Sequence, residues 1–460
     1  MSKTKIKFGT DGWRGIIADD FTFENVRRVA QATADYWNAQ PLPKKAIVGY
    51  DNRFFSEVYA KLVCEVLTGN GIEALYPPEA VPTPAISYAV RDQQLCGAVM
   101  ITASHNPPQF NGYKLKADFA GPATPEICAA IEARIDGSSV KTGTSIKEYD
   151  PRPAHVAVVK KMVDLKTIKR AKLRIAIDSM HGCGGRVLEK LVGGTTVRAT
   201  RDPLFGGVNP EPIGKNLKAL SAAVKKMRAH VGLATDGDAD RLGIVDEKGR
   251  YLSIQLVFAM LLLHLLRNRN ERGGVVVKSG NSTVLIDRIC AAYGLKCVEV
   301  PVGFKWICQQ MREQDVLIGG EESGGIGFRG HIPERDGMLA NLMLLELLAA
   351  TGKSVTKIAG EIQKEFGASA YDRIDMHFPL EQRHAFIEHL AKSPPAKLLN
   401  SPLKEVKTYD GVKYIAADDS WLMFRTSGTE PIIRIYSEAA SGLKVKQLLA
   451  QGRQTALSMK

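Results

Sequence analysis

The sequence predicts an α/β fold divided into several domains. Short runs of β-branched and other apolar residues recur along the chain, separated by turn residues and stretches of helical periodicity. This alternation is typical of largely parallel or mixed sheets covered by helices. The 460 residues exceed one ordinary core, and roughly 100 to 200 residues per domain gives three or four domains. Hydrophobic residues at 45% and charged residues at 24% match a soluble globular protein.

Six apolar runs are the strands that we expect to carry functional groups. They cover residues 45–51, 97–104, 173–182, 231–238, 274–280 and 315–325. Polar or glycine-rich turns follow these runs, and functional groups in α/β proteins collect at the carboxyl ends of strands. We therefore expect the motifs described below to share one site. The apolar run 256–266 is shorter than the roughly 20 residues of a membrane span and predicts a buried helix.

The chain is predicted to form four domains, over residues 1–150, 151–250, 251–367 and 368–460. A polar, proline-containing stretch marks the first boundary, a turn marks the second, and the end of a helical stretch marks the third. The first three segments repeat strand, glycine-rich turn and helix, which predicts similar α/β domains. The last segment lacks this pattern and is predicted to be an α+β domain.

Charge and cysteine usage limit the function classes. Lys and Arg exceed Asp and Glu by 13, so the partner is expected to be anionic, whether sugar phosphate, nucleic acid or membrane surface. No apolar stretch follows the basic N-terminus, which predicts a cytoplasmic protein without a secretory signal. The seven cysteines form no CxxC pair and are expected to be inert thiols.

The stretch TDGDADR predicts a metal site. Asp236, Asp238 and Asp240 alternate directly after an apolar run, and three crowded carboxylates call for a hard cation. A calcium EF-hand would also use Glu247, but that loop needs glycine where Arg241 stands, and helices where strand-like runs flank it. Magnesium that shares a phosphate oxygen is the predicted ion. The alternative is a solvated acidic turn.

The stretch RTSGTEPIIR predicts a phosphate-binding loop. Arg425 and Arg434 offer forked donors, and Ser427, Gly428 and Thr429 offer hydroxyls and approachable backbone amides. A plain hairpin turn would explain the glycine and serine but not the two arginines.

The glycine-rich stretch GGEESGG predicts contacts to sugar hydroxyls. Glu321, Glu322 and Ser323 supply acceptors, and the glycines let the backbone approach a ligand. Glycosidase chemistry is disfavoured, because sequence neighbours on one loop do not flank a bond from opposite sides. A solvated loop is the remaining alternative.

Four cations and one glycine turn carry weaker signals. Arg14 lies in a glycine-containing turn, and Lys305 lies in another such turn, after Gly303. Lys114 and Lys278 lie at predicted strand ends. Each lysine at a strand end is as well explained as a surface residue as by a ligand contact.

Ser104 stands beside His105 in TASHNP. A serine hydrolase would place its serine in a GxSxG elbow, which is absent, and adjacent side chains on an extended strand point to opposite faces. The predicted metal and phosphate loops favour a serine that carries a phosphoryl group. We expect Ser104 to lie on an exposed loop.

Four motifs together resemble the α-D-phosphohexomutase superfamily: TASHNP around Ser104, DGDADR, GEESGG and RTSGTEP. Their order and approximate spacing are similar to those of the family, and the resemblance covers essentially the whole chain. It implies three similar α/β domains and a fourth domain around a central cleft. It also implies that Ser104 donates its phosphoryl group to a hexose monophosphate, giving glucose 1,6-bisphosphate, which returns the opposite phosphate to Ser104.

The resemblance implies roles for single residues. Asp236, Asp238 and Asp240 match the Mg²⁺ ligands, with a phosphate oxygen on Ser104 as a further ligand. The other matching residues are the cations Arg14 and Arg241 around the reaction centre, His105, Lys114 and Lys278 in proton transfer or charge stabilisation, Glu321 and Ser323 on sugar hydroxyls, Gly303 and Lys305 in a substrate-binding turn, and Arg425, Ser427, Gly428 and Thr429 around the phosphate that is not transferred.

Glucose is the favoured sugar. The loop GEESGG and the turn PVGFKW resemble those of phosphoglucomutases, and Gly325 stands where dual-specificity and glucosamine enzymes have histidine. A phosphomannomutase, a dual-specificity enzyme or a glucose 1,6-bisphosphate synthase would keep every catalytic motif. A non-enzymatic anion or nucleic-acid binder is a more distant alternative, and no nucleic-acid or membrane partner is predicted. The sequence leaves open whether the protein is a monomer or a dimer.

Overall fold

The computed structural model describes residues 6–426 and 431–458, which form four sheets. The first sheet has the order β1-β5-β4-β2-β3-β6, in which β4, β2, β3 and β6 pair in parallel, and β5 pairs antiparallel with both β4 and β1. Its elements are β1 (Trp13–Ile16), α1 (Phe23–Asn38), β2 (Lys45–Tyr50), α2 (Ser56–Gly69), β3 (Glu73–Tyr76), α3 (Thr83–Asp92), β4 (Gly97–Ile101), β5 (Phe110–Ala117), α4 (Pro125–Glu132) and β6 (Ile146–Glu148).

The burial of strand β4 on both faces explains why its sequence is apolar without interruption. Val99 and Ile101 pack into the core that contains α1 and α2, whereas Ala98 and Met100 pack into the core that contains α3. Helices cover both faces of the sheet, so both sets of alternating side chains are buried.

The second sheet has the order β11-β10-β9-β7-β8, with β7, β8 and β9 parallel. Its elements are α5 (Arg152–Met162), α6 (Leu165–Arg170), β7 (Ile175–Asp178), α7 (Val187–Val192), β8 (Thr195–Val197), η1 (Phe205–Gly207), η2 (Gly214–Asn216), α8 (Lys218–Met227), β9 (Val231–Thr235), β10 (Leu242–Val245) and β11 (Tyr251–Leu252).

The third sheet has the order β13-β12-β14-β15, with β13, β12 and β14 parallel and β15 antiparallel. Its elements are α9 (Ile254–Leu263), the π-helical turn η3 (His264–Asn268), β12 (Val275–Ser279), α10 (Val284–Ala292), β13 (Lys296–Val300), α11 (Phe304–Glu313), β14 (Val316–Gly320), β15 (Ile326–Phe328), α12 (Gly337–Thr351) and α13 (Val355–Phe366). The second and third sheets share one core with α9 and α12. The buried helix predicted over 256–266 is confirmed as α9 with η3.

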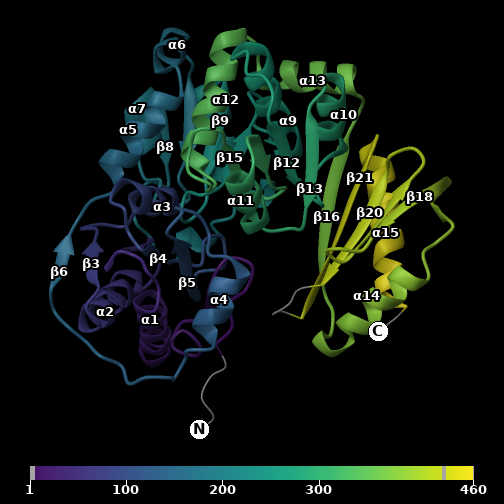
Figure 1. The fold of residues 1–460 in the computed structure, drawn as a ribbon. Coiled ribbons are helices and arrows are strands. Elements are labelled where there is room, and N and C mark those ends of the chain that lie inside the picture. The colour runs from purple at the N-terminus through teal and green to yellow at the C-terminus, as the bar shows by residue number, and fades with distance from the viewer. Residues whose placement is uncertain (1–5, 427–430, 459–460) are drawn as a thin grey trace.

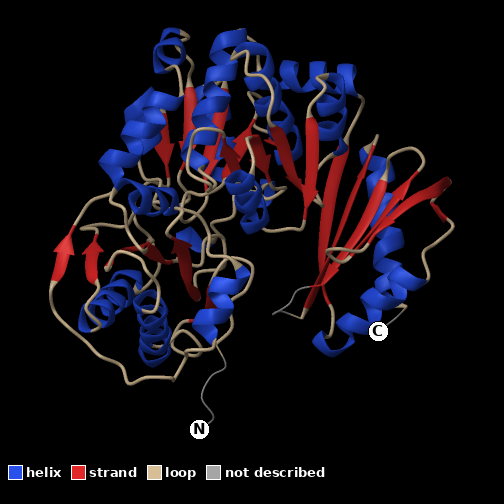
Figure 2. Cartoon of the chain, in the orientation of Figure 1, coloured by secondary structure: helices blue, strands red, loops and turns tan. Residues whose placement is uncertain are grey.

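The fourth sheet is antiparallel throughout, in the order β16-β21-β20-β19-β18-β17. Two helices, α14 and α15, cover one face (Figure 2). This confirms the predicted change from α/β to α+β. The elements are β16 (Ala370–His377), η4 (Leu380–Gln382), α14 (Arg383–Lys392), β17 (Lys397–Leu398), β18 (Ser401–Lys407), β19 (Val412–Ala416), β20 (Trp421–Thr426), β21 (Ile432–Ala439) and α15 (Gly442–Leu457).

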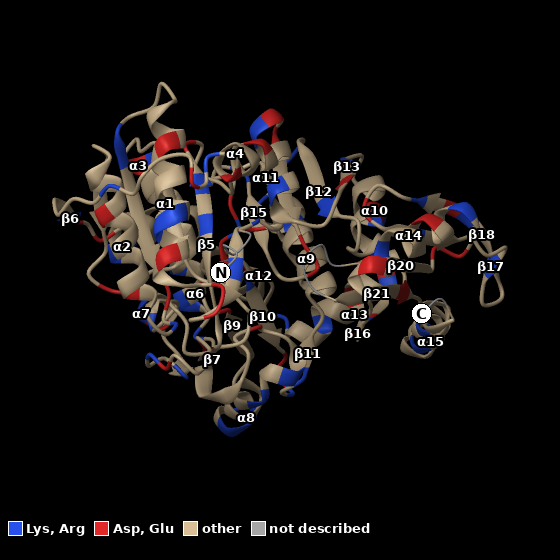
Figure 3. Ribbon diagram, turned by 90° about the horizontal axis from the view of Figure 1, so that it is seen from below, with Lys and Arg blue, Asp and Glu red and all other residues tan. Residues whose placement is uncertain are grey.

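The fourth sheet stands beside the third, and β16 is its nearest strand (Figure 1). The face of the fourth sheet opposite α14 and α15 carries Trp421, Met423 and Tyr436. These side chains pack with Val284 and Val302 of the third domain. Lys and Arg residues are interspersed with Asp and Glu along the ribbon (Figure 3).

Within the described residues no single helix combines the length and apolar character of a membrane span. Helices α12 and α13 reach that length and character only as a pair, and the chain bends by 85° between them.

Candidate functional site

Ser104 lies three residues beyond the end of β4 and is completely buried. Its hydroxyl donates to Asp236 Oδ2 at 2.8 Å, and its backbone N–H donates to Thr102 Oγ1 at 2.8 Å. The prediction of an exposed loop is therefore wrong. The turn folds back against the second domain, and the Arg53 guanidinium holds it by donating to the Ser104 carbonyl oxygen at 2.7 Å.

The side chains of Ser104 and His105 do not point to opposite faces, contrary to the expectation from an extended strand. Ser104 has a φ of 50°, which turns the chain and brings Ser104 Oγ to 3.4 Å from His105 Nδ1. That distance lies at the long limit of a hydrogen bond. Burial, together with the charges of Arg241 and Arg14, lowers the pKa of His105 well below its ordinary value. The imidazole is therefore neutral at neutral pH.

The three aspartates form a buried cluster after β9. One potential ligand oxygen from each of Asp236, Asp238 and Asp240 lies within 4.8 Å of the others. Asp236 Oδ1 accepts from the backbone N–H groups of Asp240 and Arg241 at 3.0 and 3.1 Å, which fixes the loop. Burial and the neighbouring carboxylates raise the pKa of Asp236 well above its ordinary value.

This cluster fits a hard cation. Asp238 Oδ1 and Asp240 Oδ1 are buried and have no hydrogen-bond partner among the described residues. Unpartnered buried carboxylate oxygens are costly, and oxygen ligands are those that Mg²⁺ prefers. Asp236, Asp238 and Asp240 would hold the ion, beside the Ser104 hydroxyl.

Gly237 lets two segments meet: the turn that carries Ser104, called the serine turn, and the loop that carries Asp236, Asp238 and Asp240, called the metal loop. A Cβ at this position would lie 2.6 Å from the Ser104 carbonyl oxygen, which is too close for any side chain. The close approach of these two backbones is what brings Ser104 Oγ to the carboxylates of the second domain.

Lys114, on β5, completes the cluster from the first domain. Its ammonium lies 2.7 Å from Asp238 Oδ2, 2.9 Å from Asp240 Oδ2 and 3.0 Å from Asp11 Oδ2. Burial alone would lower the pKa of Lys114, but these carboxylates raise it above its ordinary value. The lysine is therefore a fixed positive charge at neutral pH.

Arg14 and Arg241 also lie around the cluster. Arg14, on β1, donates to Asn106 Oδ1 in the serine turn. The Nε atom of Arg241 lies 3.9 Å from Asp240 Oδ1. The carboxylates are thus surrounded by cations from two domains.

The loop after β14 places Glu321 in the same region. Glu321 is 5% exposed, and burial raises its pKa above the ordinary value although the charge of Arg335 opposes the shift. Ser323 follows in the same loop and is half-buried. Glu322 points elsewhere, toward Arg373 at 2.9 Å.

The sequence reasoning missed Arg335, which links all three α/β domains. Its guanidinium contacts Asp11 of the first domain, Asp240 of the second at 2.8 Å and Glu321 of the third at 3.3 Å. Charged residues crowd into PERDG just before an apolar helix, and this pattern could have drawn attention to Arg335.

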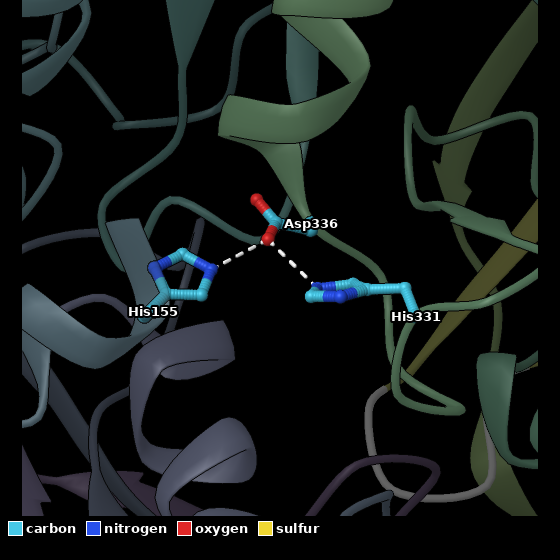
Figure 4. Close-up of side chains that lie close together, drawn as sticks. All are labelled: His155, His331 and Asp336. Carbon is cyan, nitrogen blue, oxygen red and sulfur yellow. Dashed lines mark hydrogen bonds and ion pairs between the residues drawn. The ribbon is translucent and has the colours of Figure 1, made fainter. Parts of the chain in front are cut away.

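Asp336 anchors the segment that carries Arg335. Asp336 Oδ1 caps α12 by accepting from the N–H groups of Met338 and Leu339, each at 3.0 Å. Its Oδ2 accepts from His155 Nε2 at 2.6 Å and lies 3.1 Å from His331 Nε2 (Figure 4). Both are hydrogen-bond distances, so this buried group forms a hydrogen-bonded cluster that fixes the start of α12.

Gly303, Lys305 and Lys278 lie outside this cluster of contacts. Gly303 caps α11 with a φ of 130°, and Lys305 lines a cavity of about 190 Å³ whose wall also contains Asp11. Lys278 is buried against Asp287 and lies 3.5 Å from Glu299 Oε2, at the contact between the third and fourth domains. Their roles in substrate binding or catalysis stay predictions.

Arg425 and Arg434 are cross-strand partners on β20 and β21. Arg425 Nε donates to Asp410 Oδ1 at 3.0 Å, and Arg434 Nε lies 3.9 Å from Asp375 Oδ2. The two arginines flank the segment that joins the strands. Ser427, Gly428 and Thr429 of that segment lie outside the described residues.

Comparison with known proteins gives matches along the chain. Models of phosphoglucomutase/phosphomannomutase α/β/α domains I, II and III match residues 5–141, 153–249 and 255–366, and the C-terminal domain model matches residues 388–454. A phosphoglucomutase/phosphomannomutase of Thermococcus kodakarensis is 30% identical over 456 residues, which cover 97% of each chain. A phosphoglucosamine/phosphogalactosamine mutase of Sulfurisphaera tokodaii is 30% identical over 446 residues, covering 94% of this chain and 95% of the relative.

The fold is also similar to a solved structure. The crystal structure of a "putative phosphomannomutase" from Thermus thermophilus superposes with a TM-score of 0.88 at 36% identity, covering 98% of this chain and 99% of the other. The four matched domain models, the full-length relatives and this superposition agree with the motif resemblance. The chain therefore belongs to the phosphoglucomutase/phosphomannomutase family of the α-D-phosphohexomutase superfamily.

Proposed function

We propose that the protein is a phosphoglucomutase that interconverts glucose 1-phosphate and glucose 6-phosphate through phosphorylated Ser104. The observation that carries this proposal is the position of Ser104 Oγ, 2.8 Å from Asp236 Oδ2 in the buried aspartate cluster. A phosphoryl group on this oxygen would lie among Asp236, Asp238 and Asp240 and close to fixed cations. Mg²⁺, when bound there, supplies neutralisation of the charge on the phosphoryl oxygens.

The proposed reaction has two phosphoryl transfers, and each one moves a different phosphoryl group. The bond between Ser104 Oγ and phosphorus breaks while a free hydroxyl oxygen of the hexose monophosphate forms the new bond, which gives glucose 1,6-bisphosphate. The hydroxyl proton passes to a base, and His105 is the proposed base because its Nδ1 lies 3.4 Å from Ser104 Oγ. The bisphosphate then reverses its orientation. The bond between the opposite sugar oxygen and its phosphorus breaks as Ser104 Oγ bonds to that phosphorus, and the freed sugar oxygen takes the proton back from the base.

The other predicted residues hold the sugar and its second phosphate in this proposal. Lys114, Arg14 and Arg241 stabilise the transferring group by their charge. Glu321 and Ser323 accept from or donate to sugar hydroxyls. The second phosphate and the rest of the sugar are contacted by the remaining predicted residues, which are Gly303, Lys305, Arg425, Ser427, Gly428, Thr429 and Arg434. The positive charge of Lys278 stabilises the negative charge of the phosphate.

We call residues 320–325 (GEESGG) the sugar loop, and the choice of glucose rests on this segment. The relatives' names include glucose, mannose, glucosamine and galactosamine, so they do not separate the substrates. A Cβ at Gly325 would lie 2.7 Å from Arg335 Cδ and 3.1 Å from Glu321 Oε2. A histidine at this position would displace Arg335, which supports the phosphoglucomutase-like loop over the dual-specificity and glucosamine types.

Intact-mass spectrometry with peptide mapping tests the carrier role. We expect incubation with glucose 1,6-bisphosphate and Mg²⁺ to add one phosphate at Ser104, and glucose 1-phosphate to discharge it. An unmodified Ser104 throughout would contradict the proposal and favour a non-enzymatic anion binder.

Coupled assays with glucose, mannose and glucosamine 1-phosphates then decide the substrate. Turnover preferring mannose 1-phosphate would indicate a phosphomannomutase. Net accumulation of glucose 1,6-bisphosphate would indicate a bisphosphate synthase.

A further inference from the structure

Arg373 joins three domains through one guanidinium. It lies on β16, the first strand of the fourth sheet, six positions after Gly367 at the end of α13. Its Nη1 donates to Glu322 Oε1 at 2.9 Å, and its Nη2 donates to Glu211 Oε1 at 3.2 Å. Glu322 belongs to the sugar loop of the third domain, and Glu211 lies between η1 and η2 of the second.

Both acidic partners are held in place by their own domains. Glu322 Oε2 accepts from Asn281 Nδ2 at 3.2 Å, so protein donors reach both of its oxygens. The Glu211 carbonyl oxygen accepts from Asn216 Nδ2 at 2.9 Å, which ties that segment to η2. The side chains of Glu322 and Glu211 are 9% and 13% exposed, and that of Arg373 is 25% exposed. Ion pairs with this degree of burial are screened less by solvent than exposed ones.

The face of the fourth sheet that carries Arg373 also carries the arginines predicted to bind phosphate. Arg373 and Asp375 are two positions apart on β16, so their side chains leave the same face. Asp375 is the cross-strand partner of Arg434, and Arg434 is the partner of Arg425. Cross-strand partners share a face, which places all four side chains on the face that Arg373 holds toward the second and third domains.

We propose that Arg373 is a positioning residue that sets the fourth domain, and with it Arg425 and Arg434, at the distance from Ser104 that a hexose phosphate requires. The proposal rests on the proposed mutase function. It assigns Glu322 to the contact between domains rather than to the sugar, and it gives Glu211, which no motif includes, a part in substrate binding through Arg373.

Kinetics of Arg373→Met provide the first test. Methionine keeps much of the side-chain length and removes both ion pairs, so the KM for glucose 1-phosphate should rise on the order of tenfold, with kcat changed less. Arg373→Lys can reach one carboxylate at a time and should give an intermediate KM. Arg288→Met is the matched control, because Arg288 pairs with Asp419 at 3.2 Å between the third and fourth domains, away from Glu322. It should leave the KM unchanged.

Small-angle X-ray scattering without substrate separates positioning from direct contact. We expect Arg373→Met to have a larger radius of gyration than the wild type, and Arg288→Met to match the wild type. An unchanged KM in Arg373→Met would overturn the proposal. A raised KM with unchanged scattering would also overturn it, because Arg373 would then act on the substrate directly. Absence of mutase turnover in the wild type would instead refute the proposed function, and scattering would still show whether Arg373 positions the fourth domain.

Discussion

At Ser104 a φ of 50° directs the hydroxyl toward Asp236 and the carbonyl oxygen toward Arg53. A non-glycine residue in this conformation is uncommon and is maintained by surrounding contacts. Here those contacts come from Arg53 of the same domain and from the metal loop of the next. Ser104 Oγ therefore meets the aspartate cluster only when the two domains are packed together.

Ser104→Ala is expected to abolish mutase turnover, with a loss of at least about 1,000-fold, because no atom remains to carry the phosphoryl group. The substitution removes one buried hydrogen bond, so stability should fall by only about 1 kcal/mol. A coupled assay and thermal unfolding measure the two effects. Ser437→Ala, which removes another fully buried hydroxyl in the fourth domain, is the control and should keep its activity. Turnover of the Ser104 variant near the wild-type rate would refute the carrier role.

Asp238→Asn is expected to weaken Mg²⁺ binding by at least about tenfold, because it removes a ligand charge from a site with few protein ligands. Isothermal titration of the ligand-free protein with MgCl₂ measures this without relying on activity. Asp246→Asn is the control, because Asp246 directly follows the end of β10 and lies outside the cluster, so this variant should titrate like the wild type. Equal affinity in Asp238→Asn and the wild type would mean that the loop does not bind the ion.

At the scale of single elements, strand β13 joins the third sheet to the fourth through Glu299. This carboxylate lies 3.0 Å from Lys407 Nζ and 3.5 Å from Lys413 Nζ and Lys278 Nζ. Burial alone would raise the pKa of Glu299, but the charges of Lys413 and Lys278 lower it to about 2. Burial of Lys413, together with the charge of Lys278, lowers the pKa of Lys413 to about 8.

Glu299→Gln is therefore expected to destabilise the protein in a pH-dependent way. A folded pKa below the unfolded value of about 4.3 contributes stability above that value, and the contribution is lost as pH falls toward 2. The difference in unfolding free energy between wild type and variant should be about 3 kcal/mol at pH 7 and should shrink steadily below pH 4. Denaturation at pH 7, 5 and 3 measures it. A difference independent of pH would show that the charge of Glu299 is not what stabilises this contact.

At the scale of the whole molecule, the four domains are joined unequally. The second and third sheets share one large core, whereas the fourth sheet meets the third through the small cluster of Trp421, Met423 and Tyr436. Trp421 is completely buried, and its Nε1 donates to Glu438 Oε2 at 2.8 Å. A small contact of this kind lets a domain move or unfold more independently than a shared core does.

Trp421→Ala should consequently uncouple the fourth domain. Truncating a buried tryptophan costs about 3 to 5 kcal/mol. Differential scanning calorimetry should then show a separate transition at lower temperature for the fourth domain. Val302→Ala, on the opposite side of the contact, should shift the transition in the same direction by a smaller amount. A single transition in Trp421→Ala would indicate that other contacts couple the domains.

The sequence by itself determined the α/β class, the change to an α+β domain at the C-terminus, the buried helix over 256–266 and the aspartate cluster. These features depend on local patterns, because apolar periodicity selects the element and residues two positions apart in one loop stay close in any fold. The family could also be identified from four motifs, since each lies within a few consecutive residues.

Only the tertiary structure decided which distant residues meet. Arg335, Asp336 and Arg373 lie outside the motifs, yet they join domains through partners more than 50 positions away, such as Asp11, His155 and Glu322. The burial of Ser104 and its contact with His105 likewise required the domains to be assembled and the local φ to be known. Local sequence does not encode these pairings, because they arise from the packing of whole domains against one another.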